Sequence, residues 1–118
     1  MNIPLYVVDA FAEQQFSGNP AAVCLLSYWL DERTLQKIAM ENNLSETAFV
    51  VHSEQGVEIR WFTPNSEVDL CGHATMAAAY VLYRYTDRVI NDQINFLTVE
   101  RGLLTVSCLP EDEFRLDF

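Results

Sequence analysis

The sequence has little of what marks linker-rich, fibrous or membrane-spanning chains. Only four Gly and four Pro occur among its 118 residues, too few for a linker-rich or fibrous chain. No uncharged apolar run reaches the roughly 18 residues that a membrane span needs. The apolar stretch from Ile3 to Val8 has no basic residue before it, and Asp9 ends it too early for the core of a signal peptide. We therefore expect a cytoplasmic protein with no membrane partner.

Basic residues are also scarce. Seven Lys and Arg stand against 17 Asp and Glu, which gives a formal net charge of −10. A nucleic-acid backbone or an anionic membrane surface would be repelled by that field, so both are excluded as expected partners. A small anionic substrate stays possible, because helix ends and backbone amides outweigh net charge at short range.

The three cysteines have no spacing typical of a disulfide pair, so we expect reduced thiols. Cys24 and Cys108 stand in apolar runs and are expected in the core. Cys71 lies two positions from His73, and His52 is distant, so no zinc-ligand spacing is present and no metal is expected. A nucleophilic Cys71 would need a nearby base, such as His73, and a third group to orient that base. The sequence shows no such third group.

What the sequence does have is apolar residues, 50% of the chain. With 118 residues, this predicts one globular domain, residues 1–118, with a single core. Period-2 patterns and turn residues predict strands, and the pattern after Asp31, its N-cap, predicts a helix that ends near Asn42 and Asn43. The expected strands are Ile3–Phe11, Ala21–Leu26, Thr47–His52, Val57–Thr63, Gln93–Val99, Leu103–Leu109 and Phe114–Phe118.

The segment from His73 to Tyr85 predicts a second helix of unusual character. No charged residue stands between His73 and Tyr83. A helix that is apolar on all sides is normally buried on all sides. In a domain this small, a sheet must then wrap the helix rather than lie along one of its faces.

Glu46 is the first candidate for chemistry, since it stands where the expected helix gives way to an apolar strand. Apolar surroundings disfavour the charged carboxylate and move its pKa toward the working pH, which suits a group that both takes and gives a proton. The alternative is an ordinary solvated turn glutamate.

The start of the second helix is the next candidate. Gly72 permits close backbone approach, and the first amides of a helix bind carboxylate or phosphate. His73 would add a donor or a proton carrier. The alternative is a plain helix start with a locally bonded His73. Earlier, Asn19 stands in a Gly-Asn-Pro turn, where turn chemistry alone accounts for the sequence, although its amide would serve as a ligand contact.

Taken in order, these segments resemble the N-terminal half of the PhzF-like (phenazine biosynthesis-type) isomerases of the diaminopimelate-epimerase-like superfamily. The similarity runs from about Ile3 to Tyr83, and the strand pattern extends it to the end. It rests on Val8-Asp9-Ala10-Phe11, Gly18-Asn19-Pro20-Ala21-Ala22-Val23, Asn43-Leu44-Ser45-Glu46-Thr47-Ala48-Phe49, Arg60-Trp61-Phe62-Thr63-Pro64 and Glu67-Val68-Asp69-Leu70-Cys71-Gly72-His73-Ala74-Thr75.

The resemblance implies an α+β fold in which a mixed β-sheet curls as a barrel around a central apolar helix. It implies that Glu46 is catalytic and moves a proton between two carbons of a small carboxylated substrate, with His73 beside it. It further implies substrate binding by Asn19, Asp69 and the Gly72-His73-Ala74 helix start. No cofactor or metal is implied.

The second domain of such proteins, with the groups that face Glu46 across the cleft, has no counterpart here. Three interpretations follow. A homodimer or a partner chain completes an isomerase site; the chain is a binding module for small anions; or it is a truncated piece, as its abrupt stop after Phe118 indicates. The superfamily's epimerases carry a Cys-Gly step similar to Cys71-Gly72, so a symmetric thiol pair is a further alternative.

Overall fold

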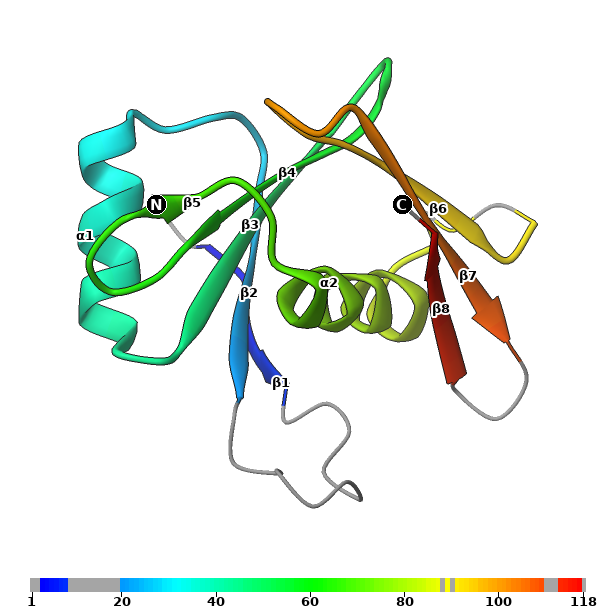
Figure 1. The fold of residues 1–118 in the computed structure, drawn as a ribbon, viewed down its shortest axis with the longest axis horizontal. Helices are drawn as coiled ribbons and strands as arrows, with labels where there is room; N and C mark the ends of the chain where they lie inside the picture. Colours follow the sequence, from blue (N-terminus) through cyan, green and yellow to red (C-terminus); the bar gives the residue numbers. More distant parts are fainter. Residues whose placement is uncertain (1–2, 9–19, 88, 90, 110–112, 118) are drawn as a thin grey trace.

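The computed structural model describes residues 3–8, 20–87, 89, 91–109 and 113–117. Within them the chain forms a single curved sheet and two helices (Figure 1). In chain order the elements are β1 (Leu5–Val8), β2 (Ala21–Leu26), α1 (Glu32–Asn42), β3 (Glu46–Ser53), β4 (Gly56–Phe62), β5 (Glu67–Val68), α2 (Gly72–Tyr85), β6 (Gln93–Leu97), β7 (Leu103–Leu109) and β8 (Glu113–Asp117).

The sheet is mixed, as expected. Its strand order is β1-β2-β3-β4-β6-β7-β8, with β5 paired to β4 off this path. The β2–β3 and β4–β6 pairs are parallel, and the other pairs are antiparallel. Each parallel pair is joined by a helical crossover, which parallel pairing requires. α1 makes the first crossover on the outer face, and α2 makes the second inside the curve of the sheet (Figure 1).

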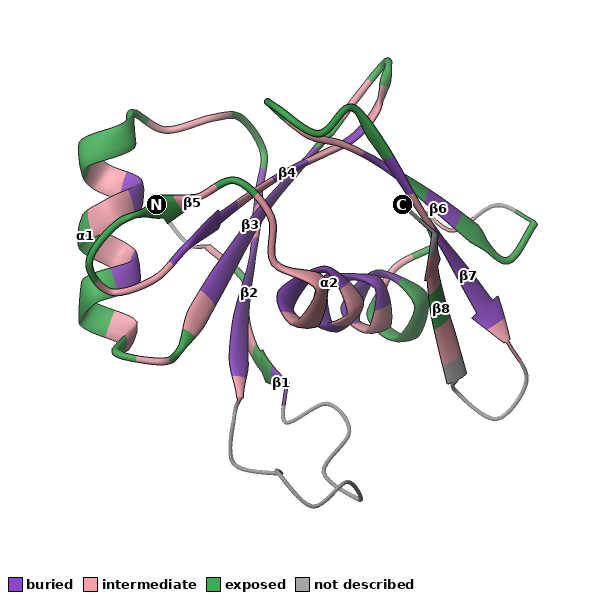
Figure 2. Cartoon of the chain, in the orientation of Figure 1, coloured by how far each residue is buried: buried purple, intermediate pink, exposed green. Residues whose placement is uncertain are grey.

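α2 forms the centre of the main core because its middle is built of small apolar residues. Ala74, Ala77, Ala78 and Val81 are all 0% exposed, and small side chains let the helix approach the sheet closely. Strand residues from both halves of the sheet pack around it (Figure 2). They include Ala21, Val23, Ala48, Val50, Ile59, Trp61, Ile94, Phe96, Leu104 and Val106.

α1 packs a second, smaller core on the outer face of β2, β3 and β4, built around Leu35, Ala39, Phe49 and Phe62. The helix starts where the Asp31 carboxylate accepts a hydrogen bond from the Thr34 amide at 2.7 Å. It ends at Asn43, whose left-handed φ of 53° is one that Asn tolerates. Both caps are confirmed as predicted.

The sheet curls around α2 without closing, so β1 and β8 are its two edges. Aromatic side chains from the end of α2 fill the gap between them. Tyr85 stacks on Tyr6 of β1 at 4.9 Å between ring centroids, and Tyr80 meets Phe114 of β8 edge-on at 6.0 Å. The curled mixed sheet is confirmed, whereas the barrel stays a prediction.

Several expected elements need adjustment. The prediction that α2 is buried on all sides is wrong at its end, where Tyr83 and Tyr85 are 37% and 56% exposed, because the open side of the sheet leaves that face uncovered. The short strand β5 falls between the expected strand Val57–Thr63 and the expected helix from His73, where no strand was predicted. The first strand is described only to Val8, and the rest of its predicted range lies outside the described residues. Within the described part, neither helix is long and apolar enough to cross a membrane.

Candidate active site

Glu46 is the first residue of β3 and is half-buried. Its position is fixed by a tight connection from α1, since Asn42 at the helix end donates from Nδ2 to the Thr47 hydroxyl at 3.2 Å. Thr47 is 0% exposed. In the parallel ladder Glu46 lies beside Ala21, the first residue of β2. The glutamate therefore stands at the end of the sheet where β2 and β3 begin.

The start of α2 lies close to Glu46. Cys71 caps the helix: its Sγ accepts a hydrogen bond from the Ala74 amide at 3.4 Å. The carbonyl of Cys71 accepts from both the amide and the hydroxyl of Thr75, at 3.0 and 2.7 Å. Gly72 packs near β8, where an added Cβ would lie 3.6 Å from Leu116 Cδ2. The helix start is thus held firmly with its amides directed at the Cys71 sulfur.

The pKa of the Cys71 thiol depends on several groups in this region. Burial raises the pKa of Cys71 above its ordinary value, and the negative charge of Glu46 raises it further. The amides of Ala74 and His73 act in the opposite direction and lower it. A carboxylate and the positive end of a helix therefore act on the same sulfur atom, with half-buried His73 in the first turn.

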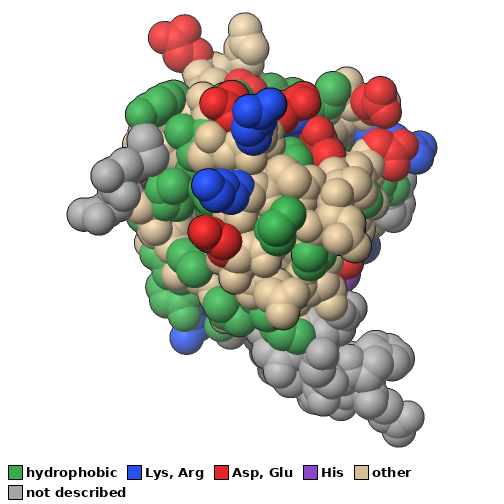
Figure 3. All heavy atoms as spheres, turned by 90° about the vertical axis from the view of Figure 1, so that its left-hand side faces the viewer, with side chains coloured by type: hydrophobic (Ala, Val, Ile, Leu, Met, Phe, Trp, Pro, Cys, Tyr) green, Lys and Arg blue, Asp and Glu red, His purple; other side chains and the backbone are tan. Residues whose placement is uncertain are grey.

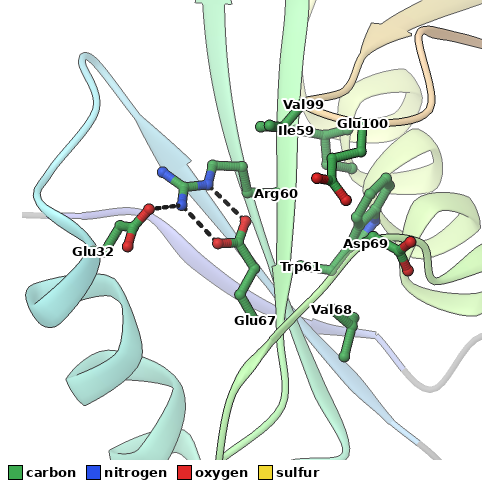
Figure 4. A pocket seen from close by; sticks show the side chains of 9 residues that line it. All are labelled: Glu32, Ile59, Arg60, Trp61, Glu67, Val68, Asp69, Val99 and Glu100. Carbon is green, nitrogen blue, oxygen red and sulfur yellow. Dashed lines mark hydrogen bonds and ion pairs between the residues drawn. The ribbon is translucent and has the colours of Figure 1, made fainter.

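Asp69, a further predicted site residue, is placed differently. It is 54% exposed and pairs with Arg101, from the turn between β6 and β7, at 3.1 Å. It also lines a recess beside β4, next to Glu100 (Figure 4). The other substrate contact, Asn19, lies outside the described residues. The structure brings Glu46 together with the Gly72-His73-Ala74 helix start, and Asp69 stands two residues before that cap.

Arg60 links several elements of the fold, a role that the sequence analysis did not predict. Its guanidinium pairs with Glu32 of α1 at 2.9 Å and with Glu67 of β5 at 2.7 Å (Figure 4). It also lies 5.6 Å from the ring centroids of both Trp29 and Phe62. The signal was available in the alternation of β4, which puts residues 58, 60 and 62 on the outer face.

Among the described residues, no group of three or more His, Cys, Asp or Glu side chains is placed to hold a metal ion. All three cysteines are free thiols, and Cys24 and Cys108 are buried as predicted. On the face that α1 covers, Lys and Arg side chains stand among carboxylates (Figure 3). The fold and site thus define an α+β domain with a carboxylate opposite a helix N-terminus.

Sequence comparison gives the family. The profile described as "Phenazine biosynthesis-like protein" matches residues 8–115, and the chain belongs to this family. It is 51% identical over 107 residues to an uncharacterized isomerase of Halalkalibacterium halodurans, covering 91% of this chain and 40% of that protein. It is 49% identical to the human phenazine biosynthesis-like domain-containing protein, covering 87% of this chain and 38% of that one.

Comparison with solved structures gives the same family. A PhzF-family phenazine biosynthesis protein of Enterococcus faecalis superposes with a TM-score of 0.85 at 52% identity, covering 94% of this chain and 42% of that one. A predicted epimerase of Pseudomonas aeruginosa shares the fold at 22% identity and a TM-score of 0.74. The chain spans about two fifths of the length of these relatives. The resemblance to this family is confirmed.

Proposed function

We propose that this chain provides one half of an isomerase site, in which Glu46 moves a proton between two carbons of a small carboxylated substrate. The observation that carries the proposal is the α2 cap, where the Ala74 amide donates to Cys71 Sγ at 3.4 Å while the charge of Glu46 acts on the same thiol. A carboxylated substrate that loses a proton from carbon needs a base and a binding site for its carboxylate. Glu46 would be the base and the start of α2 the carboxylate site, and both lie near Cys71.

The proton transfer balances without a cofactor. The Glu46 carboxylate removes a proton from one carbon, the electron pair shifts along the substrate, and the carboxylic acid so formed returns the proton to another carbon. The substrate carboxylate binds at the amides of Gly72, His73 and Ala74. The Ala74 amide donates to a thiol sulfur in this structure, and sulfur is a weak acceptor that a carboxylate replaces readily.

The site needs a second half. Glu46 is only half-buried, and water at an open site weakens each electrostatic contact. The relatives are more than twice as long as this chain. A second copy, or a partner chain, would close the cleft and shield Glu46 from water.

Solvent-exchange NMR tests the activity. Protein would be incubated in D2O with a panel of small unsaturated hydroxy and amino carboxylic acids, and deuterium incorporation at carbon would be followed. Wild type should exchange at least one acid, and Glu46→Gln should abolish the exchange while leaving the thermal midpoint nearly unchanged. Exchange that survives in Glu46→Gln removes Glu46 from the mechanism.

The solution mass tests the second half. Light scattering across a dilution series should give a dimer if a second copy closes the cleft. A stable monomer would instead favour a binding module for small carboxylates. Calorimetry with succinate would then show affinity without turnover, reduced in His73→Ala.

A further inference from the structure

One side of β4, the side away from β3, is paired with other strands at both ends and is unpaired in the middle. β5 pairs with residues 61–62, and β6 pairs with residues 57–58. β3 occupies the other edge along the whole of β4. Among the described residues, Ile59 and Arg60 therefore have no strand partner on this side of β4. Since successive residues of a strand direct their backbone groups to opposite edges, one of the two presents its N–H and C=O to the gap.

A recess of about 330 Å³ lies at this gap (Figure 4). That volume is at the lower end of the range for ligand pockets, so it fits one long side chain and a short piece of backbone. Apolar and acidic residues line it together. They are Glu32, Ile59, Arg60, Trp61, Glu67, Val68, Asp69, Val99 and Glu100.

The charges around the recess favour a cation. Arg60, the only basic residue among the described ones that line it, is already held by Glu32 and Glu67. Across the recess, Asp69 pairs with Arg101, whose side chain is 50% exposed. Glu100 has no ion-pair partner in the described part of the chain. The four lining carboxylates stand against two guanidiniums, those of Arg60 and of the neighbouring Arg101, so the recess keeps a net negative charge. Val99, 75% exposed, offers apolar contact at its rim.

Trp61 adds an independent observation. Its side chain lines the recess, yet the residue is only 2% exposed, and its Nε1 has no hydrogen-bond acceptor among the described residues. The other tryptophan, Trp29, donates from Nε1 to Glu58 at 2.7 Å. A buried N–H without an acceptor costs free energy that a bound carbonyl oxygen would recover. A ligand that fits this recess should therefore carry a hydrogen-bond acceptor for Trp61 as well as a positive charge.

We propose that this recess binds an extended peptide carrying Lys or Arg, which adds to β4 in the gap between β5 and β6. One residue of the peptide backbone pairs with the N–H and C=O that face the gap, which is strand addition limited to a single residue. The aliphatic stem of the peptide's Lys or Arg side chain lies along Val68 and Val99. The charged end of that side chain reaches Glu100 and Asp69. A peptide carbonyl accepts from Trp61 Nε1–H after a small shift of the indole.

Two tryptophans make the test direct. ¹⁵N-labelled protein gives one indole N–H cross-peak for each, and the hydrogen-bonded Trp29 serves as the internal reference. Titration with acetyl-Val-Lys-Val-amide should move the Trp61 peak downfield more than that of Trp29. Acetyl-Val-Gln-Val-amide should produce no such shift. An equal response to the Gln peptide, or no response to either, overturns the proposal.

Two variants and one free cation define the site. Glu100→Gln should weaken binding of the Lys peptide at least about threefold, as loss of an exposed ion pair allows. Glu41→Gln removes the same charge from the exposed side of α1, away from the recess, and should leave binding unchanged. Agmatine alone should bind more weakly than the peptide; equal affinity would overturn strand addition and leave a simple cation site. None of these outcomes depends on Glu46.

Discussion

Glu46 and Cys71 are electrostatically linked although they belong to different elements, the first residue of β3 and the cap of α2. Burial is the main cause that raises the pKa of the Cys71 thiol, and the Glu46 carboxylate raises it further. The parallel start of β2 and β3 puts Glu46 at the end of these strands, where its charge reaches the cap of α2. This link joins the proposed base to the proposed anion site.

Glu46→Gln should lower the pKa of Cys71, because the neutral amide no longer disfavours the nearby thiolate. More thiolate would then be present at pH 8, and iodoacetamide should label Cys71 faster than in wild type. Peptide-resolved mass spectrometry measures the rate. Glu41→Gln serves as the control and should label at the wild-type rate; equal rates in all three proteins would contradict the link.

Cys24 should make stability fall at high pH. Burial raises its pKa from 9.0 to about 11, against a smaller lowering by Asn42. The unfolded chain therefore loses this proton first, and stability present below pH 9 is lost as the pH rises toward 11. Two pKa units correspond to about 2 to 3 kcal/mol.

Urea unfolding of wild type and Cys24→Ala at several pH values isolates that effect. The variant should be less stable by about 1 to 2 kcal/mol near pH 7.5, because a buried group is lost. The difference should shrink or reverse by pH 10.5. A gap that stays constant with pH would show that Cys24 ionises normally in the folded protein.

Arg60→Lys should destabilise the fold although it keeps the charge. Lysine cannot make the two-pronged contact with Glu67, nor stack as a plane between Trp29 and Phe62. We expect a loss of about 1 kcal/mol in urea unfolding, less at high salt. Arg33→Lys, at an exposed position of α1, is the matched control and should change stability little.

Tyr80→Ala should loosen both edges of the sheet, because Tyr80 meets Phe114 of β8 edge-on and also meets Tyr85, which stacks on Tyr6 of β1. We expect a loss of about 2 to 3 kcal/mol, since Tyr80 is half-buried. Tyr80→Phe keeps the ring contacts and should stay within about 0.5 kcal/mol of wild type. Hydrogen exchange would localise the effect: faster exchange in β1 and β8 than in β3 is the expected pattern.

Local signals were enough to predict most of the elements. Asp31 and Asn43 bound α1 because capping depends on a few neighbouring residues. The charge-free run of α2 predicted a wrapped helix, confirmed for its middle and wrong for its last turn. β5 was missed, since two residues carry no periodicity.

The sequence by itself determined the family, the mixed fold and the proposal of Glu46 and the Gly72-His73-Ala74 helix start as site residues, because ordered motifs and caps are written in neighbouring positions. Only the tertiary structure decided that Glu46 acts on Cys71, that Arg60 joins α1 to β5, and that the sheet stays open between β1 and β8. These relationships join residues far apart in the chain, and their geometry depends on strand order and the curvature of the sheet, which no local pattern encodes.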